Sequence, residues 1–422
     1  MLKSVRRIYF ILLIIAPLSP RLGAVDRVAA DWMFYAFAGL FGIVATAFFN
    51  YKFFKEINDK RFFYPLIFHG ALLLIAAISM IFALNKVESV VTLIKLFIIF
   101  INLYVIYALK IYEINFKFIL YPVLILFMVE VVSSLYPLFV DILPVAKFDF
   151  SYTSYLKGIT ANRNITAASI LVKLPLIMIL LKNKSVVFRI LLYSLIFFCF
   201  INILFLSSRA GILSLIFIIL SIFIFDNFQN IKKFDFRRFL PSTKLVFIFL
   251  ASYLFFNSNI ESENKVSLDQ RFESINLEDE SASTRIRFYK QALTYFTENP
   301  FYPIGIGNWK LYSIYLEKEK IRSYIIPYVV HNDFLEILVE TSIFGFLSYI
   351  LFFISLIYLL QVAFKKLNKV QKEIYLIALS LLVYLIDSNL NFPFYRPLMQ
   401  VNLAVILILT LHYYKKIKIS NE

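Results

Sequence analysis

Long runs of apolar residues recur along almost the whole chain and leave few folds open to it. Many of these runs are roughly 17–23 residues long, the length of helix that crosses a hydrocarbon core about 30 Å thick. A segment within lipid must satisfy its own backbone hydrogen bonds, and runs of this length do so as helices rather than as barrel strands. Hydrophobic residues make up 61% of the sequence, whereas soluble domains contain about 45–50%. The sequence therefore predicts an all-α, polytopic integral membrane protein.

About twelve membrane spans are expected, separated mostly by short polar loops. They cover roughly residues 9–20, 30–50, 63–83, 88–108, 117–139, 164–181, 190–206, 210–226, 244–257, 333–361, 373–387 and 397–413. The first follows basic residues, as a signal peptide would, but no clean small-residue cleavage site comes after it, so we interpret it as a helix. The simplest organisation is one integral membrane domain over residues 1–422, with the long connection 258–331 forming a cap.

The distribution of Lys and Arg predicts the orientation of these spans. A net charge of +16 is compatible with nucleic-acid binding, but the positive residues gather in short loops between apolar runs, so no nucleic-acid partner is expected. Alternate loops and the two tails hold 24 Lys and Arg, and the short loops on the other side hold eight. Because positive residues stay on the cytoplasmic side, both termini are expected in the cytoplasm and the connection 258–331 outside.

The sequence offers little to hold a metal or a cofactor. Cys199 is the only cysteine, which excludes a disulfide within the chain and a multi-thiolate metal site. Walker A, HExxH, CxxC and dinucleotide-binding glycine motifs are missing. We therefore expect no cofactor and no metal, and a reaction that uses an already activated donor.

The external connection has a helical part. A helix is expected from about 284 to 298, with Ser283 as its N-cap. Its apolar face is predicted to lie against the membrane surface or the bundle, and consists of Ile286, Tyr289, Leu293 and Phe296. Asn299-Pro300 ends this helix, and a second short helix is expected near 310–322.

Only one of the three histidines is expected on the outer face. His331 stands where the external connection re-enters the membrane, whereas His69 and His412 belong to expected spans. On the helix that follows His331, Glu336 and Glu340 stack one turn apart. An imidazole within reach of carboxylates is suited to act as a general base or to orient one. A histidine that only caps the start of a helix fits the same spacing.

Arginines are expected beside the same outer boundary, namely Arg163, Arg209, Arg285 and Arg287. Guanidinium groups bind phosphate oxygens through paired hydrogen bonds and stay charged, so the group suits a pyrophosphate better than a neutral ligand. Each arginine also fits a role in which it only reaches lipid phosphates. Arg209 has the least choice of partner, because almost no loop separates the two spans around it.

Three charged residues fall well inside expected spans: Lys95, Glu130 and Lys173. An unpaired charge at the bilayer centre costs about 2.5–3.5 kcal/mol on insertion scales. We favour an ion pair between Glu130 and one of the lysines. The alternative is a proton or ion path, as in a transporter.

Several sequence blocks occur in a recognisable order over about residues 158–400. They are Gly158-Ile-Thr-Ala-Asn-Arg-Asn164, Ser207-Ser-Arg-Ala-Gly211, Arg285-Ile-Arg-Phe-Tyr289 with the 299–308 turn, His331-Asn-Asp-Phe-Leu-Glu336 continuing to Gly345, and Asp387-Ser-Asn-Leu-Asn-Phe-Pro-Phe-Tyr-Arg396. Together they resemble the O-antigen ligase and polymerase superfamily, and the block that begins at His331 is the most specific. One departure is Ser342, where family sequences often have glycine.

The resemblance implies a function. Members of this family move a glycan from undecaprenyl pyrophosphate to an acceptor at the outer face of the bacterial inner membrane. It implies that Arg209 and Arg285 hold the pyrophosphate and that His331 helps to activate the acceptor hydroxyl. The implied partners are a lipid-linked glycan, an acceptor such as the lipid A core or another glycan, and membrane lipids. The further substrate-binding candidates on these blocks are Arg163, Asn164, Arg287, Asn332, Glu336 and Arg396.

Several alternatives stay open at this point. Within the family, ligation of O-antigen, polymerisation of repeat units and transfer to protein hydroxyls compete, and the compact external connection favours the ligase type. A secondary transporter is the main alternative of another class, although paired halves with interrupted spans are not evident. A non-catalytic glycan-binding scaffold is the third possibility.

Overall fold

The computed structural model of the protein describes residues 1–20, 23, 26–49, 59–182, 185–233, 240–261, 280–318 and 328–419. Within these ranges every regular element is helical, and the only extended pairing is an isolated bridge between Phe148 and Ile260. The chain divides into two compact units. Unit 1 comprises Met1–Ile119, Glu273–Ala378 and Asp387–Glu422, and unit 2 comprises Leu120–Phe272 and Leu379–Ile386.

The predicted all-α membrane fold is confirmed. Ten helices of the described chain are long and apolar enough to cross a membrane. They are Val28–Phe48, Lys60–Phe82, Lys86–Ala108, Phe116–Ile142, Arg163–Lys182, Val186–Leu206, Arg209–Asn227, Asp333–Lys366, Asn368–Leu390 and Pro397–Ile417. The expected spans 9–20 and 244–257 form α1 (Leu2–Ile15) and α9 (Leu240–Asn259), which are not among the ten. With 14 residues, α1 is about 21 Å long and shorter than the hydrocarbon core.

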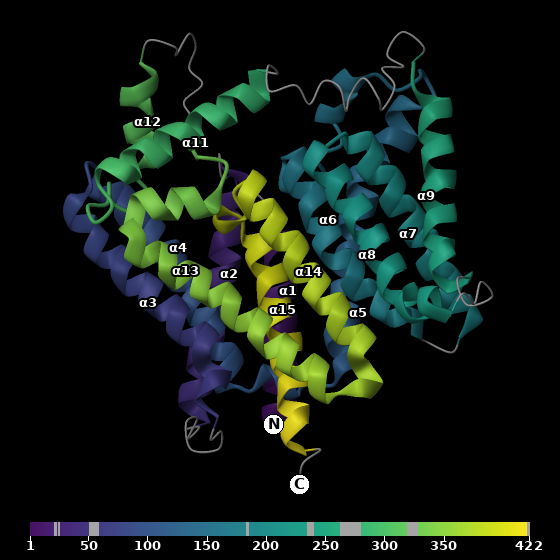
Figure 1. Ribbon diagram of the computed structural model, residues 1–422, viewed down its shortest axis with the longest axis horizontal. Coiled ribbons are helices and arrows are strands. Elements are labelled where there is room, and N and C mark those ends of the chain that lie inside the picture. Colours follow the sequence, from purple (N-terminus) through teal and green to yellow (C-terminus); the bar gives the residue numbers. More distant parts are fainter. Residues whose placement is uncertain are drawn as a thin grey trace. The chain divides into compact units, whose positions relative to one another are not determined.

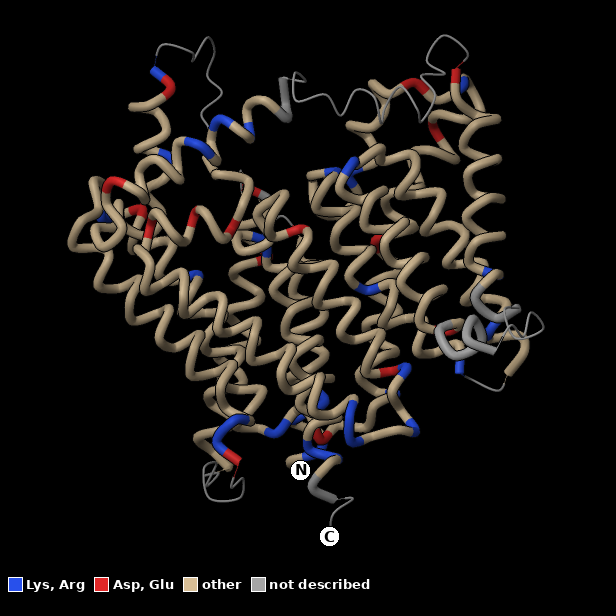
Figure 2. The backbone as a smooth tube through the Cα atoms, viewed as in Figure 1, with Lys and Arg blue, Asp and Glu red and all other residues tan. Residues whose placement is uncertain are grey.

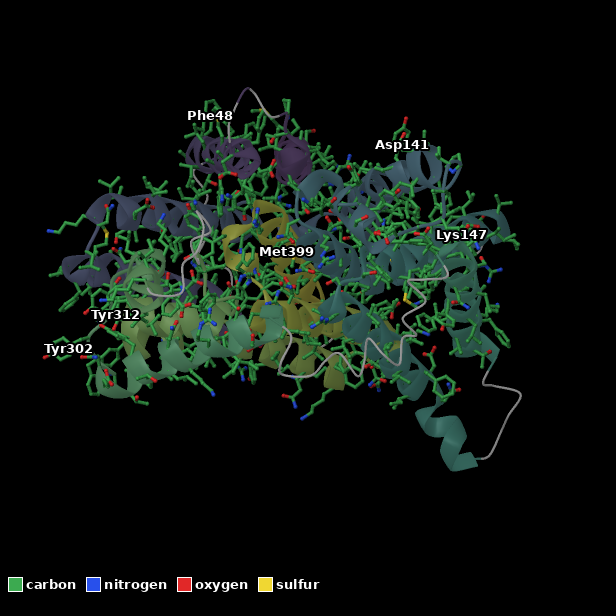
Figure 3. All side chains as sticks on the ribbon, turned by 90° about the horizontal axis from the view of Figure 1, so that it is seen from above. Phe48, Asp141, Lys147, Tyr302, Tyr312 and Met399 are labelled. Atoms are coloured by element: carbon green, nitrogen blue, oxygen red, sulfur yellow. The ribbon has the colours of Figure 1, made fainter. Side chains whose placement is uncertain are left out.

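Unit 1 is built from helices that come from both ends of the sequence. It contains α1, α2 (Arg27–Phe48), α3 (Tyr64–Ser79), α4 (Lys86–Ala108), α11 (Glu280–Glu298), α12 (Trp309–Glu317), α13 (Asp333–Lys366), most of α14 (Gln371–Leu390) and α15 (Pro397–Ile419). Helix α13 packs along α3 and against α15, and α2 packs on α4. Figure 3 shows Met399 of α15 enclosed among the other side chains, with Tyr302 and Tyr312 at the edge of the unit.

The two ends of unit 1 differ in charge. Helices α1 and α15 place the chain termini at one end, and Lys and Arg gather there, whereas α11 and α12 lie at the other end (Figures 1 and 2). At the end with the termini, Arg6 pairs with Glu113 at 2.9 Å, and Lys415 contacts the same carboxylate. This arrangement is what the positive-inside pattern of the sequence leads us to expect.

Unit 2 contains the rest of α5 (Phe116–Pro137), together with α6 (Arg163–Met178), α7 (Val186–Leu206), α8 (Arg209–Lys233) and α9. Helix α6 contacts both α7 and α8, and α7 packs along α9. The expected buried ion pair is present here. Lys173 Nζ lies 2.9 Å from Glu130 Oε1, and both side chains are almost fully buried. The pair ties α6 to α5, which is the structural role that we favoured for it.

The cap of unit 1 has its own apolar core. Phe288 and Ala292 of α11 are buried together with Ile304, Trp309, Val330 and Val339, and Tyr289 and Phe296 pack against this group. Of the expected apolar face, Leu293 is instead 45% exposed, so the buried stripe of α11 is centred about one position earlier. The helix begins at Glu280, so Ser283 lies inside it rather than at its N-cap, and it ends at Glu298 as predicted. The second helix is α12, Trp309–Glu317, and the last part of its expected range lies outside the described residues.

Helix α13 is broken near its start, and the break receives the loop after α11. Ser342 has φ 64° and ψ −176°, so the helix bends there into a short first part and a long second part (Figure 1). The bend frees backbone groups that the loop then satisfies. Ile304 N donates to Val339 O at 3.0 Å, and Ile343 N donates to Pro300 O at 3.3 Å. Glu340 accepts hydrogen bonds from Gly307 N and Trp309 N, both at 2.8 Å.

Candidate active site

The backbone at His331 is held in an unusual conformation. His331 has φ 63°, in the left-handed region that few residues other than glycine occupy, and it directly precedes α13. Asn332 is the N-cap of α13, and its side-chain oxygen accepts a hydrogen bond from Leu335 N at 3.1 Å. Val330 N donates to Glu336 Oε2 at 2.8 Å, so both neighbours of His331 are tied to the first turn of the helix. Such conformations persist only where the surroundings fix them.

The imidazole of His331 packs against an aromatic ring and keeps one nitrogen unpaired. Its ring lies edge-on to Phe392, with 5.3 Å between the ring centroids. Within the described part of the chain, the buried Nδ1 atom has no hydrogen-bond partner. Burial, and in smaller part the charge of Arg285, lowers the pKa of His331 from 6.5 to about 4. The imidazole is therefore neutral at physiological pH and able to accept a proton.

Arg285 reaches the site from the first turns of α11. Its Nη1 donates to Leu390 O, at the end of α14, at 3.0 Å. One turn further along α11, the Tyr289 hydroxyl lies 2.9 Å from His331 O and 3.0 Å from Asn389 O, and it donates to one of them at a time. Helix α11 thus joins the end of α14 to the backbone of His331. Arg285 and His331 therefore lie in the same part of unit 1, and their joint role stays a prediction.

Arg396 packs on Phe392, the aromatic residue that also contacts His331. Its guanidinium carbon lies 4.9 Å from the centroid of Phe392, the ring that packs on His331. Its buried Nε atom has no hydrogen-bond partner among the described residues. Burial lowers the pKa of Arg396, and the charges of Asp26 and Asp31 oppose that shift. An arginine stays protonated even so, and this one is a largely buried cation.

The acidic residues after His331 bind backbone rather than the imidazole. Asp333 Oδ2 accepts from Phe394 N at 2.9 Å, which fixes the segment that carries Phe392 and Arg396. Glu336 accepts from Val330 N and from the hydroxyl of Tyr395. Burial and the nearby carboxylates raise the pKa of Tyr395, so its hydroxyl stays protonated and can donate. We expected a carboxylate beside the imidazole, and the described residues place Phe392 and Arg285 there instead. The cause is that the carboxylates point back to unpaired backbone N–H groups.

Arg287 is engaged elsewhere. Its Nε and Nη2 lie 2.9 Å and 2.8 Å from the two carboxylate oxygens of Glu317 on α12, in a bidentate ion pair. Gln291 donates to the same carboxylate. Because Glu317 is buried, this contact attaches α12 to α11. The guanidinium that the sequence suggested for substrate binding has its hydrogen-bonding edge occupied by a carboxylate.

The remaining candidates belong to unit 2. Arg163 is the first residue of α6, is exposed, and donates from Nη1 to Thr153 Oγ1 at 3.0 Å. Asn162 caps the same helix and accepts from the backbone N–H of Asn164 at 2.9 Å. Arg209 is the first residue of α8 and is exposed, directly after Ser207 with φ 51° and Ser208. The roles of Arg163, Asn164 and Arg209 stay predictions from the sequence.

Two residues of the site were not identified from the sequence. Phe392 and Tyr289 lie in the blocks that carry the resemblance, but both read as ordinary apolar positions. Phe392 follows Asn389-Leu-Asn391, just before the last span. An aromatic residue at that place is the one signal that pointed to it.

Comparison with known protein families finds a match to part of the chain. The family model described as O-antigen ligase matches residues 194–350, a stretch that includes Arg209, Arg285 and His331. No curated protein matches the sequence. The match supports a glycosyltransferase-like function in the membrane, of the ligase or polymerase kind. Together with the all-helical membrane fold, this match supports the O-antigen ligase superfamily for the chain.

Proposed function

We propose that the protein transfers a glycan from undecaprenyl pyrophosphate to an acceptor hydroxyl at the outer face of the cytoplasmic membrane, as an O-antigen ligase does. The observation that carries the proposal is the His331 imidazole. It has an unpaired Nδ1 among the described residues and a pKa near 4, the charge of Arg285 acts on it, and Arg396 packs on the same Phe392 ring as the imidazole does. A neutral base beside fixed positive charges suits a reaction that removes a proton and releases an anion.

The chemistry follows from these groups. The acceptor hydroxyl oxygen forms a bond to the anomeric carbon of the donor, and its proton passes to the imidazole of His331. The bond between the anomeric carbon and the pyrophosphate oxygen breaks, and undecaprenyl pyrophosphate leaves with the negative charge. Guanidinium groups stabilise that charge more as it develops than in the ground state. General base catalysis contributes a factor of about 10²–10⁴.

The other residues divide into two groups. In unit 1 the proposed donor-binding residues are Arg285 and Arg396. In unit 2 the resemblance alone assigns the same role to Arg209, Arg163 and Asn164. Asn332 and Glu336 are positioning residues, because their side chains fix the backbone around His331. Arg287 is left out of the proposed site, since Glu317 occupies its guanidinium.

The orientation of the protein in the membrane is part of the proposal. The Lys- and Arg-rich end of unit 1, with both termini, faces the cytoplasm, and α11 and α12 face the outer side of the bacterial inner membrane. His331 then lies at the level where a lipid-linked pyrophosphate and an acceptor meet. The transporter alternative loses its main sequence support, because Glu130 and Lys173 form a buried pair between two helices.

The acceptor is tested by direct competition. Purified protein receives a defined undecaprenyl-pyrophosphate glycan together with lipid A core, a second donor molecule and a serine-containing peptide. Transfer to lipid A core supports the ligase proposal. Growth of the glycan on the second donor would make the protein a polymerase, and labelled peptide would make it a protein glycosyltransferase. No transfer to any of the three, with donor still bound, would leave a glycan-binding scaffold.

A further inference from the structure

Lys95 is a charged residue inside a span that the proposed mechanism does not use. It lies near the middle of α4, Lys86–Ala108. No hydrogen bond or ion pair to Lys95 occurs among the described residues. The indole of Trp32 lies beside it, with 6.0 Å between Nζ and the ring centroid. A cation–π contact at the outer limit of its range offsets only part of the cost of a charge inside a span.

Trp32 itself has an unused donor. The side chain is only 6% exposed, and its Nε1–H finds no acceptor in the described part of the chain. A buried indole N–H usually has a partner. Lys95 and Trp32 therefore bring an ammonium and an orphaned N–H donor together on neighbouring helices, since α2 packs on α4.

Arg396 adds a third unsatisfied donor. It directly precedes α15, which packs on both α2 and α4, so it lies beside the helices that carry Trp32 and Lys95. Its positive charge acts on Lys95, and its buried Nε lacks a partner within the described residues. Two cations near one another in a poorly hydrated interior repel unless an anion lies between them. Arg396 also contacts Phe392, so its guanidinium lies within about 10 Å of the His331 imidazole, by the two ring contacts.

The carboxylates near these cations do not neutralise them by direct contact. Asp26 influences both Lys95 and Arg396, but its side chain caps α2 and accepts from Val28 N at 2.9 Å. Asp31 influences Arg396 and accepts from Ser19 Oγ at 2.7 Å. The charge of Glu88 acts on Lys95, but its carboxylate pairs with Lys310 at 2.5 Å. Neither Lys95 nor Arg396 has a carboxylate oxygen within ion-pair distance among the described residues.

We infer that Lys95, Trp32 and Arg396 form a binding site for the diphosphate of a polyprenyl-linked glycan. The inference rests on the proposed function and adds two residues, Lys95 and Trp32, to the donor site. A diphosphate offers several anionic oxygens, which match two cations and the neutral N–H donor of Trp32 better than a single carboxylate does. Its place near Phe392 leaves the sugar end of the donor directed toward His331.

The test measures binding rather than turnover. Full-length protein in a phosphate-free maltoside detergent is titrated with undecaprenyl diphosphate, and the fluorescence of Trp32 is followed in a Trp309→Phe background, where it is the only tryptophan. Calorimetry on the natural chain replaces fluorescence if that background lowers the yield. Undecaprenol, which lacks phosphate, inorganic pyrophosphate and phosphatidylglycerol are titrated in parallel, so that the carrier diphosphate is distinguished from a free anion and from an ordinary phospholipid.

The Lys95→Met variant has two controls: Lys86→Met removes a charge from the same helix, and Lys95→Arg keeps the charge at the same position. Lys95→Met and Arg396→Gln are expected to weaken diphosphate binding about ten- to hundred-fold, as expected for a lost charged hydrogen bond. Lys95→Arg keeps the charge and is expected to bind more tightly than Lys95→Met. Lys86→Met, which removes an exposed charge at the start of the same helix, and His331→Ala are expected to bind nearly as the wild type does.

Three results would overturn the inference. The first is wild-type diphosphate affinity in Lys95→Met, together with higher thermal stability. Lys95 would then be a buried charge that destabilises the fold and does not bind the diphosphate. The second is equal affinity for undecaprenol, and the third is equal affinity for phosphatidylglycerol. If diphosphate binding depends on Lys95 while transfer never occurs, the site stands and the proposed function falls. If transfer depends on His331 while Lys95→Met binds the diphosphate normally, the proposed function stands and the Lys95 site falls.

Discussion

The imidazole of His331 packs edge-on against the ring of Phe392, with 5.3 Å between centroids and 68° between the ring planes. The same Phe392 ring receives the guanidinium of Arg396 at 4.9 Å. One aromatic side chain therefore sets the positions of a neutral base and of a cation. Asp333, from the start of α13, holds this aromatic segment through Phe394 N.

Replacing Phe392 should reduce activity more than stability. In Phe392→Ala, His331 and Arg396 both lose the surface that orients them, and misplacement of a reacting group by about 1 Å can cost a factor of 10² in rate. We expect kcat in the transfer assay to fall about 100-fold, and Phe392→Leu to recover part of it. Phe97→Ala, at a half-exposed position on α4, is the matched control. A Phe392→Ala enzyme as fast as the control would show that the ring contact has no part in the reaction.

The pH dependence of the reaction follows from the pKa of His331. Because burial and Arg285 lower this pKa to about 4, the acid limb of kcat/KM should lie near pH 4 rather than near 6.5. Arg285→Gln removes a positive charge and should move the limb to higher pH. The neutral imidazole is favoured in the folded state, so this contribution to stability is complete above pH 6.5 and is lost as the pH falls toward 4. An acid limb that stays in place in Arg285→Gln would contradict the proximity of the two residues.

Much of the fold and part of the site could be predicted from the sequence. Apolar runs and Lys and Arg counts depend on local composition, which is why the helices and the basic end of unit 1 follow from them. His331 and Arg285 were found because few polar residues occur near the expected outer boundary. Their contacts could not be predicted, because they depend on backbone breaks. Val330 N, beside the left-handed turn at His331, binds Glu336, and Gly307 N, in the loop that packs on the bend of α13, binds Glu340, so neither carboxylate reaches the imidazole.

The role of Arg287 separates a structural contact from a substrate contact. Arg287→Met leaves the buried carboxylate of Glu317 without its cation, so we expect the free energy of unfolding to fall by about 1–3 kcal/mol. The activity per folded molecule should change little. The double change Arg287→Met with Glu317→Gln should recover part of the stability, since no unpaired charge is then buried. Thermal melts and donor titrations decide the matter. Unchanged stability with weaker donor binding would restore Arg287 to the site.

Ser342 offers a prediction of gained stability. Its φ of 64° and ψ of −176° lie in a region that is essentially confined to glycine. Ser342→Gly should therefore stabilise the protein by about 1 kcal/mol, measured as a rise in Tm. Ser348→Gly, in the regular part of the same helix, should instead destabilise it by about 0.5–1 kcal/mol. Equal effects of the two changes would mean that α13 is not broken at Ser342.

The most direct test of the proposed chemistry is glycan transfer by His331→Ala in detergent, from a defined undecaprenyl-pyrophosphate glycan to lipid A core. We expect the rate to fall by at least about 100-fold, with normal yield, unchanged melting temperature and donor affinity close to wild type. A His331→Ala protein that transfers glycan within threefold of the wild-type rate would show that the imidazole beside Phe392 is not the base.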